Sequence, residues 1–253
     1  MTPRGAEVVA VVGDRFEGIA RLDGVLTLTE LLRLAEDEPE VLPRTIVIGQ
    51  GVNGSDLAEL STVIEESGHV PRPEIRHQPL NLVSRSASHK RRSQNVLVAN
   101  LRSAGTLTTT ADLRLENDNE LLLDHQTGQH VQGMVVVEAS RQMFLASTHC
   151  LRLIDGLQDP YFVIASMATE FHSFLFPLPA SLRFETTEPD RSRPESAGFV
   201  AVIEIEQNGV SVSTTRVGYT VFAGARIHQI ESKKAEGAVN AQIPRRAAGA
   251  DRA

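Results

Sequence analysis

A polar segment with two histidines leads through a glycine into a mostly apolar stretch that carries a carboxylate. Its chemically relevant residues are, in chain order, Asp124, His125, His130, Gly133 and Glu138. Buried carboxylates are rare unless they are paired or functional, so a glutamate directly after three valines is unusual. An imidazole that titrates near neutral pH beside such a carboxylate indicates acid–base chemistry.

Glu138 is the leading candidate for a catalytic group. If residues 133–149 form a helix, Arg141 and Gln142 lie three and four positions later, on the same face. Desolvation raises the pKa of a carboxyl group, and an ion pair with Arg141 would offset that rise. Glu138 could therefore act as a general acid, a general base or an orienting group. Alternatively, the Glu138–Arg141 pair is structural.

The remaining residues of this segment have supporting roles in the same interpretation. His125 and His130 are alternative general bases, and either could equally be an exposed loop residue. Asp124 is placed to orient the neighbouring imidazole of His125. Gly133 would open the helix, where backbone N–H groups can polarise a thioester carbonyl that approaches closely.

The elements around this segment divide the chain near residue 80. Before it, apolar runs at 7–13 and 44–49 alternate with helical patterns at 26–36 and 54–68. This alternation predicts a small α/β unit of the βαβ type with parallel pairing over residues 1–80, and a third strand around Ile75.

A glycine loop in this first unit has two interpretations. Gly49, Gly51 and Gly54 have the Gly-x-Gly-x-x-Gly spacing between a predicted strand and a predicted helix. That spacing is compatible with a phosphate cradle, but it also suits a tight strand-to-helix turn without a ligand. The turn is the favoured interpretation, because the unit is too small for a complete dinucleotide fold.

The second region, residues 84–231, has the content of an α+β fold with one long helix and an antiparallel sheet. The helix is predicted at 133–149, a stretch at 162–168 suits either a helix or a strand, and Gln207-Asn208-Gly209 predicts a hairpin. Strands are expected at 93–101, 106–115, 180–186, 199–205 and 210–222. Residues 232–253 are small and charged, which predicts a disordered tail.

Two separated motifs resemble one known family, the A-factor biosynthesis hotdog domain (AfsA-like). The first is Asp-His, then His-Val-x-Gly-Met, then Glu-Ala-x-Arg-Gln over residues 124–142. The second is Ser88 to Val98, which opens with His89-Lys90 before an apolar strand. The resemblance covers roughly residues 84–230 and implies a single hotdog domain, in which antiparallel strands wrap a central helix.

The resemblance implies acyl-thioester chemistry. Members of the family include the synthases of γ-butyrolactone-type signals, which transfer a β-ketoacyl group from a carrier to the hydroxyl of dihydroxyacetone phosphate. Such synthases usually carry two hotdog domains in tandem, and this chain departs from that pattern. The alternatives are a dehydratase or thioesterase acting on a carrier-bound acyl thioester, and a non-catalytic hotdog protein that binds an acyl ligand or organises partners.

The implied substrate also gives the basic run at residues 89–92 a function. The phosphopantetheine of an acyl carrier protein or of coenzyme A would bring the acyl group, and no further cofactor is expected. His89, Lys90 and Arg92 could bind its phosphates or an acidic carrier protein, as Gln142 and Gly133 could bind the acyl group. The competing interpretation is a solvated charged surface.

Composition limits the other functions. A net charge of −7, aromatic residues at 4% and no tryptophan argue against a nucleic-acid-binding protein. The single cysteine, Cys150, excludes an internal disulfide, and no ligand set for a metal is apparent. With no apolar run near the ~20 residues of a membrane span, a cytoplasmic protein is expected. A single hotdog sheet exposes an edge strand, which predicts a homodimer.

Overall fold

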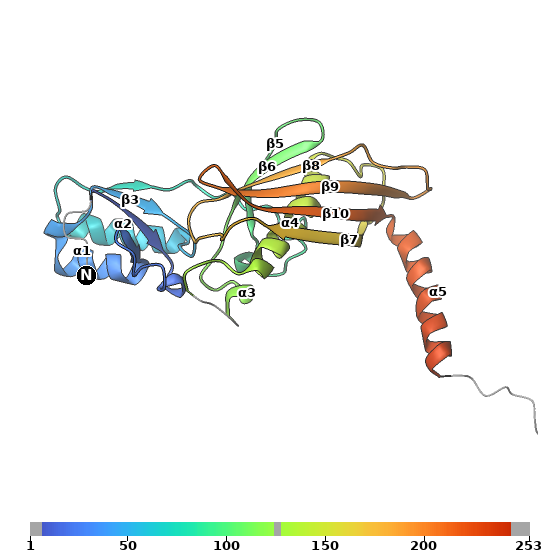
Figure 1. The fold of residues 1–253 in the computed structure, drawn as a ribbon, viewed down its shortest axis with the longest axis horizontal. Helices are drawn as coiled ribbons and strands as arrows, with labels where there is room; N and C mark the ends of the chain where they lie inside the picture. The colour runs from blue at the N-terminus through green and yellow to red at the C-terminus, as the bar shows by residue number, and fades with distance from the viewer. Residues whose placement is uncertain (1–6, 124–127, 244–253) are drawn as a thin grey trace, which may run out of the picture.

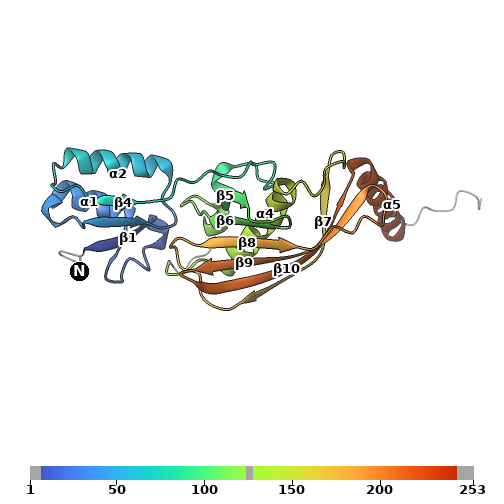
Figure 2. The ribbon, with the colours of Figure 1, turned by 90° about the horizontal axis from the view of Figure 1, so that it is seen from above.

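The computed structural model describes residues 7–123 and 128–243, which form two sheets placed side by side along the molecule (Figures 1 and 2). The first sheet has four parallel strands in the order β2-β1-β3-β4, and the second has six antiparallel strands in the order β5-β6-β8-β9-β10-β7. The predicted α+β class, with an α/β unit before a hotdog domain, is confirmed.

The N-terminal unit has its two long helices on one face of the parallel sheet. Buried Leu31 of α1 and Leu60 of α2 pack with Val9, Val11 and Ile46 of the strands. Both helices begin at capping boxes, which satisfy backbone N–H groups of the first turn. The elements are β1 (Val8–Val12), β2 (Val25–Thr27), α1 (Leu28–Asp37), β3 (Thr45–Ile48), α2 (Gly54–Glu66) and β4 (Glu74–Arg76).

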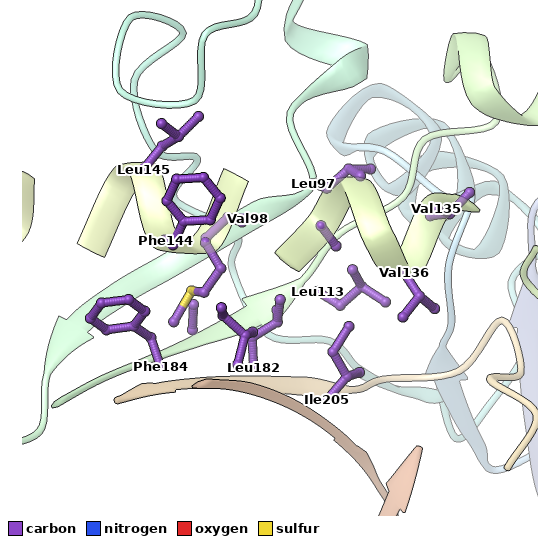
Figure 3. Packing of buried hydrophobic residues seen from close by; sticks show 14 of the residues in the cluster. Leu97, Val98, Leu113, Val135, Val136, Phe144, Leu145, Leu182, Phe184 and Ile205 are labelled. Atoms are coloured by element: carbon purple, nitrogen blue, oxygen red, sulfur yellow. The ribbon is translucent and has the colours of Figure 1, made fainter. Parts of the chain in front are cut away.

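The hotdog domain wraps its sheet around the central helix α4. Alternate residues of β6, β8 and β9 are buried, as expected for strands with one face against a helix. Figure 3 shows apolar side chains of α4 and of these strands filling the space between them. The elements are β5 (Val98–Ser103), β6 (Thr108–Leu113), α3 (Glu120–Leu123), α4 (Gly133–Cys150), β7 (Tyr161–Phe171), β8 (Ser181–Thr186), β9 (Ser196–Gln207) and β10 (Val210–Phe222).

Three local predictions can be compared with these elements. The ambiguous stretch at 162–168 is part of strand β7. The hairpin at 207–209 is confirmed, and Asn208 and Gly209 both adopt the positive φ of its tight turn. The expectation of a disordered tail from residue 232 is corrected, because helix α5 (Gly224–Gln242) continues through this stretch, which is rich in the good helix formers Ala, Lys and Glu. Residues 244–253 lie outside the described residues.

The predicted glycine loop joins the two units. Gln50 donates its backbone N–H to Pro177 O at 2.9 Å, and Gly51 donates its own to Leu115 O at 2.9 Å. The buried Gln50 side chain accepts from Leu115 N at 2.7 Å and donates to Leu113 O at 3.0 Å. These amides are therefore already used within the protein, and the loop is a tight junction instead of a phosphate cradle.

The buried cores of the two units meet at this junction. Val12, Phe16 and Ile19 of the N-terminal unit belong to the same apolar cluster as α4 and the hotdog strands. Glycine is required at position 49, because a Cβ there would lie 2.5 Å from Pro177 O. The N-terminal unit is thus packed directly onto the hotdog domain.

We expect Gly49→Ala to destabilise the whole molecule, whereas Gly54→Ala should not. The added methyl at Gly49 meets backbone that cannot move away easily, and overpacking of this kind costs about 1–3 kcal/mol. At Gly54, the first residue of α2, nothing lies within 4 Å of the added atom. Urea denaturation of both variants checks this; equal midpoints would contradict the proposed role of the junction.

Candidate active site

Glu138 lies near the beginning of α4, on a side of the helix covered by the loop that precedes β5. Its side chain is only 16% exposed, so the carboxylate must find partners within the protein. The neighbouring turn of the helix supplies Arg141 and Gln142, as predicted from the spacing in the sequence. The covering loop supplies Lys90, which is 48 positions away in the chain.

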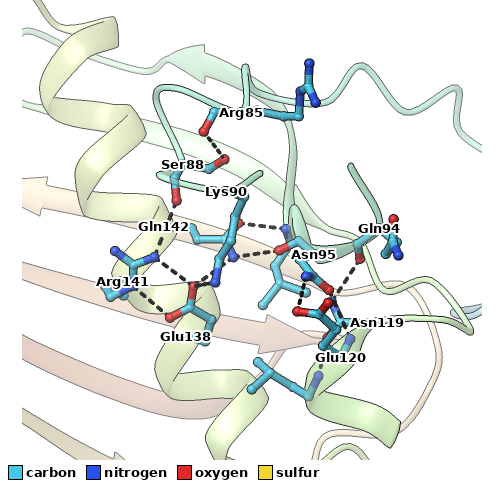
Figure 4. Close-up of polar contacts among 12 residues, drawn as sticks. Arg85, Ser88, Lys90, Gln94, Asn95, Asn119, Glu120, Glu138, Arg141 and Gln142 are labelled. Atoms are coloured by element: carbon cyan, nitrogen blue, oxygen red, sulfur yellow. Dashed lines mark hydrogen bonds and ion pairs between the residues drawn. The ribbon is translucent and has the colours of Figure 1, made fainter. Parts of the chain in front are cut away.

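The Glu138 carboxylate binds all three of these side chains (Figure 4). Arg141 donates to both carboxylate oxygens, with Nε 2.7 Å from Oε2 and Nη2 2.9 Å from Oε1. Lys90 Nζ lies 2.6 Å from Oε1, and Gln142 Nε2 donates to the same oxygen at 3.0 Å. One carboxylate is thus shared by two cations and one amide.

These contacts set the protonation state of the carboxyl group. Burial of Glu138 raises its pKa, but the hydrogen bonds and charges of Arg141, Lys90 and Gln142 together outweigh burial and hold the pKa below its ordinary value. Glu138 is therefore ionised at neutral pH. Arg141 therefore offsets the effect of burial on the pKa of Glu138, as the sequence allowed, and Lys90 lowers this pKa further.

Gln142 connects this carboxylate to the backbone that enters β5. Its Oε1 accepts from Leu97 N at 2.8 Å, and its Nε2 also donates to Asn95 O at 2.9 Å. Arg141 in addition donates to Ser88 O at 3.4 Å. The covering loop is therefore fixed to α4 at both of its ends.

The basic run separates into residues that face Glu138 and residues that do not. Lys90 is directed to the carboxylate, whereas Arg92 pairs with Glu120 at 2.7 Å near the surface. His89 adopts a left-handed backbone conformation, with φ at 52°. Non-glycine residues rarely adopt this conformation, and they do so most often at tight or functional sites.

Two histidines and a phenylalanine extend the site, and one of the histidines was not predicted. The rings of His89 and His149 lie 5.6 Å and 5.5 Å from the ring of Phe162 on β7. Partial burial, and then the charges of Arg141 and His149, lower the pKa of His89, while partial burial lowers the pKa of His149. Both imidazoles are therefore neutral near pH 7. No motif in the sequence joined His149, at the end of α4, to residue 89.

The other predicted residues lie in or near the segment that precedes α4. Asp124 and His125 lie outside the described residues. The ring of His130 packs against that of Phe174, with centroids 4.8 Å apart. Gly133 is the first residue of α4, and a Cβ there would lie 3.1 Å from the ring of Phe171. Gly133 is exposed, so a ligand could reach the beginning of the helix.

Two features are absent from the described ranges, 7–123 and 128–243. No group of three or more His, Cys, Asp or Glu side chains is arranged to hold a metal ion. No helix within these ranges is both long and apolar enough to cross a membrane.

A cleft of about 510 Å³ lies away from Glu138, between α2 and the outer side of β6 and β8. Its lining includes Leu57, Leu82, Asp112 and Ser181, and none of the residues that bind Glu138 belongs to it. The cleft follows from the junction of the two units and is separate from the candidate site.

A family model described as the A-factor biosynthesis hotdog domain matches residues 73–223. Similar solved structures include a mutant thioesterase from Pseudomonas aeruginosa, with 17% identity, 58% of this chain and 96% of that chain covered, and a TM-score of 0.39. Another is a dehydratase heterocomplex from Xenorhabdus doucetiae, with 12% identity, 55% and 91% covered, and a TM-score of 0.41. No curated protein matches the chain in sequence.

The contacts of Glu138 predict a specific dependence of stability on pH. Because the pKa of Glu138 is lower in the folded protein than in the unfolded chain, its ionisation stabilises the fold above the unfolded pKa, near 4.5. This contribution disappears as the pH falls through the folded pKa. Glu138→Gln should therefore cost about 1–3 kcal/mol at pH 7, and less under acidic conditions.

Urea denaturation at pH 7 and at acidic pH measures this difference. Glu120→Gln is the matched control, since its pair with Arg92 is largely exposed and should contribute less than about 1 kcal/mol. A Glu138→Gln variant as stable as the wild type at pH 7 would show that the carboxylate does not hold the loop.

Proposed function

The chain belongs to the A-factor biosynthesis hotdog domain family, and from this premise we propose that it is an acyl-thioester enzyme of specialised metabolism. The proposed reaction transfers a β-ketoacyl group from a thioester to the hydroxyl of a small phosphorylated acceptor, as in γ-butyrolactone-type signal biosynthesis. The donor is an acyl carrier protein or acyl-coenzyme A. The observation that carries the proposal is the pairing of the Glu138 carboxylate with Lys90 and Arg141, which favours its ionised form.

The charge on Glu138 distinguishes between the reactions considered for this fold. Dehydration needs a protonated acid that gives its proton to the departing hydroxyl group. Transfer of an acyl group to a hydroxyl needs a base, and the thiolate can depart unaided because the pKa of a thiol is only about 8.5. A carboxylate that is held ionised cannot supply that proton, so it favours acyl transfer, or hydrolysis of the thioester, over dehydration.

The reaction can be written on the residues of the site. The acceptor oxygen forms a bond to the thioester carbon, its proton passes to Glu138 or to the neutral imidazole of His89, and the carbon–sulfur bond breaks. The backbone N–H groups at Gly133 are proposed to stabilise the oxyanion that develops. Lys90 and Arg141 supply positive charge for the phosphate of the acceptor or of the carrier.

A non-catalytic role is the second candidate, and one observation favours it. Glu138 already has three partners, Lys90, Arg141 and Gln142, so in the free protein its oxygens are occupied. In that case the same group of side chains would only anchor the loop, and the domain would bind an acyl ligand without turnover.

An acyl-transfer assay with a β-ketoacyl thioester and dihydroxyacetone phosphate separates these candidates. We expect Glu138→Gln to lower turnover by about 10²–10⁴, the usual contribution of an acid–base group. Glu120→Gln should leave turnover unchanged. Thiol release without the acceptor would favour a thioesterase, and no turnover in the wild type with any thioester would leave the binding role.

We also propose that two copies of the chain pair through β7. Ile164 of this edge strand lies opposite buried Tyr219 of β10, and yet Ile164 is 42% exposed. Phe171, at the end of β7, is 55% exposed. A long edge strand with exposed apolar side chains invites pairing, and a second copy supplies both a strand and a helix.

A lysine in the edge strand should prevent this pairing. We expect Ile164→Lys to shift the protein from dimer to monomer in light scattering at micromolar concentration. Val200→Lys is the matched control, because Val200 is 61% exposed but lies on central strand β9. A wild-type monomer, or a dimer unaffected by Ile164→Lys, would contradict the proposed interface.

A further inference from the structure

Two buried side-chain atoms lack a hydrogen-bond partner among the described residues. They are Nε2 of Gln132 and Oγ of Ser213, and Ser213 is 0% exposed. Leaving a buried polar group unpaired costs about 1–3 kcal/mol. Such groups are few in folded proteins, and each one calls for an explanation, such as a functional role or a bound water or ion.

Both residues lie toward the beginning of α4. Gln132 is the N-cap residue of this helix, and its side chain makes no capping hydrogen bond. Ser213 of β10 is the register partner of Phe171 of β7, so their side chains are neighbours on one face of the sheet. The ring of Phe171 in turn packs against Gly133, the first helical residue.

The beginning of α4 is itself open to an oxygen ligand. The helix has 18 residues, so its N-terminus carries a partial positive charge, and no acidic residue lies in its first turn. The N–H of Val135 bonds back to Gln132 O at 3.0 Å. Gly133 and Met134, the residues before it, are exposed.

We propose that Gln132 and Ser213 form a polar recess that binds an oxygen on the third carbon of the acyl chain. This inference rests on the proposed function and adds a specificity determinant to it. The amide of Gln132 is a donor, and the Ser213 hydroxyl can donate as well. A 3-oxo group accepts from both, while the thioester carbonyl, two carbons away, faces the N–H groups at Gly133.

Phe171 covers the recess and controls access to it. Phe171 is the register partner of Ser213, and it is 55% exposed at the end of an edge strand. Entry of the acyl chain displaces the ring, which exposes the two donors to the ligand. A saturated chain gains the apolar contact but leaves both donors unpaired, and so it binds less well.

The test compares coenzyme A thioesters of 3-oxooctanoic, 3-hydroxyoctanoic and octanoic acids. The wild type should favour the 3-oxo substrate in kcat/KM. Ser213→Ala and Gln132→Met should each lower that preference about tenfold, which is the loss of one hydrogen bond of about 1.4 kcal/mol. Ser211→Ala, an exposed position on the same strand, should keep the wild-type preference.

Two further measurements separate this inference from the proposed function. Calorimetry with the unreactive amide analogues of the 3-oxo and saturated substrates reports binding without turnover. Ser213→Ala should also melt no lower than the wild type when free, because it removes an unpaired buried hydroxyl. If Ser213→Ala does not fold, Gln132→Met gives the same comparison.

Each outcome has one meaning. Turnover in the wild type with an unchanged 3-oxo preference in both variants overturns the recess and leaves the proposed function standing. Absence of turnover, with a 3-oxo preference in binding that both variants lose, overturns acyl transfer and supports the recess. Equal binding of the two amide analogues to the wild type overturns the recess regardless of turnover.

Discussion

The candidate site is organised around one carboxylate, that of Glu138, whose side chain is only 16% exposed. Burial alone would favour the neutral form of Glu138, and only the combined donation by Lys90, Arg141 and Gln142 keeps it ionised. The same bonds attach the loop before β5 to α4. The same set of contacts therefore stabilises this end of the hotdog domain and sets the charge of the candidate site.

Two buried glutamines form hydrogen bonds with backbone groups where the chain enters β5 and where it leaves β6. Gln142 binds Leu97 N and Asn95 O before β5, and Gln50 binds Leu115 N and Leu113 O after β6. A primary amide suits this role because it presents a donor and an acceptor side by side. The first glutamine positions the candidate site, and the second attaches the N-terminal unit.

The polar groups of the domain thus fall into two kinds. Those around Glu138 and Gln50 are paired, which makes the loop and the junction rigid. Nε2 of Gln132 and Oγ of Ser213 have no hydrogen-bond partner among the described residues, and exposed Phe171 at the sheet edge pairs in register with Ser213 and packs against Gly133. The paired groups therefore stabilise the loop before β5 and the junction of the two units. The unpaired groups lie near the proposed ligand site and the proposed β7 interface.

Local patterns in the sequence determined the central helix, the Glu138–Arg141 pair one turn apart, the hairpin at Asn208 and the change from an α/β to an α+β pattern near residue 80, because periodicity and turn chemistry act over a few residues. The hotdog fold was implied by the resemblance of two motifs to one family. Tertiary structure alone decided the approach of Lys90 to Glu138, the proximity of His89 and His149, and the use of the Gly49–Gly51 amides. All three contacts join segments that are far apart in the chain. The lowered pKa of Glu138 also required the folded structure, because burial raises this pKa, pairing lowers it, and only the folded geometry sets the balance.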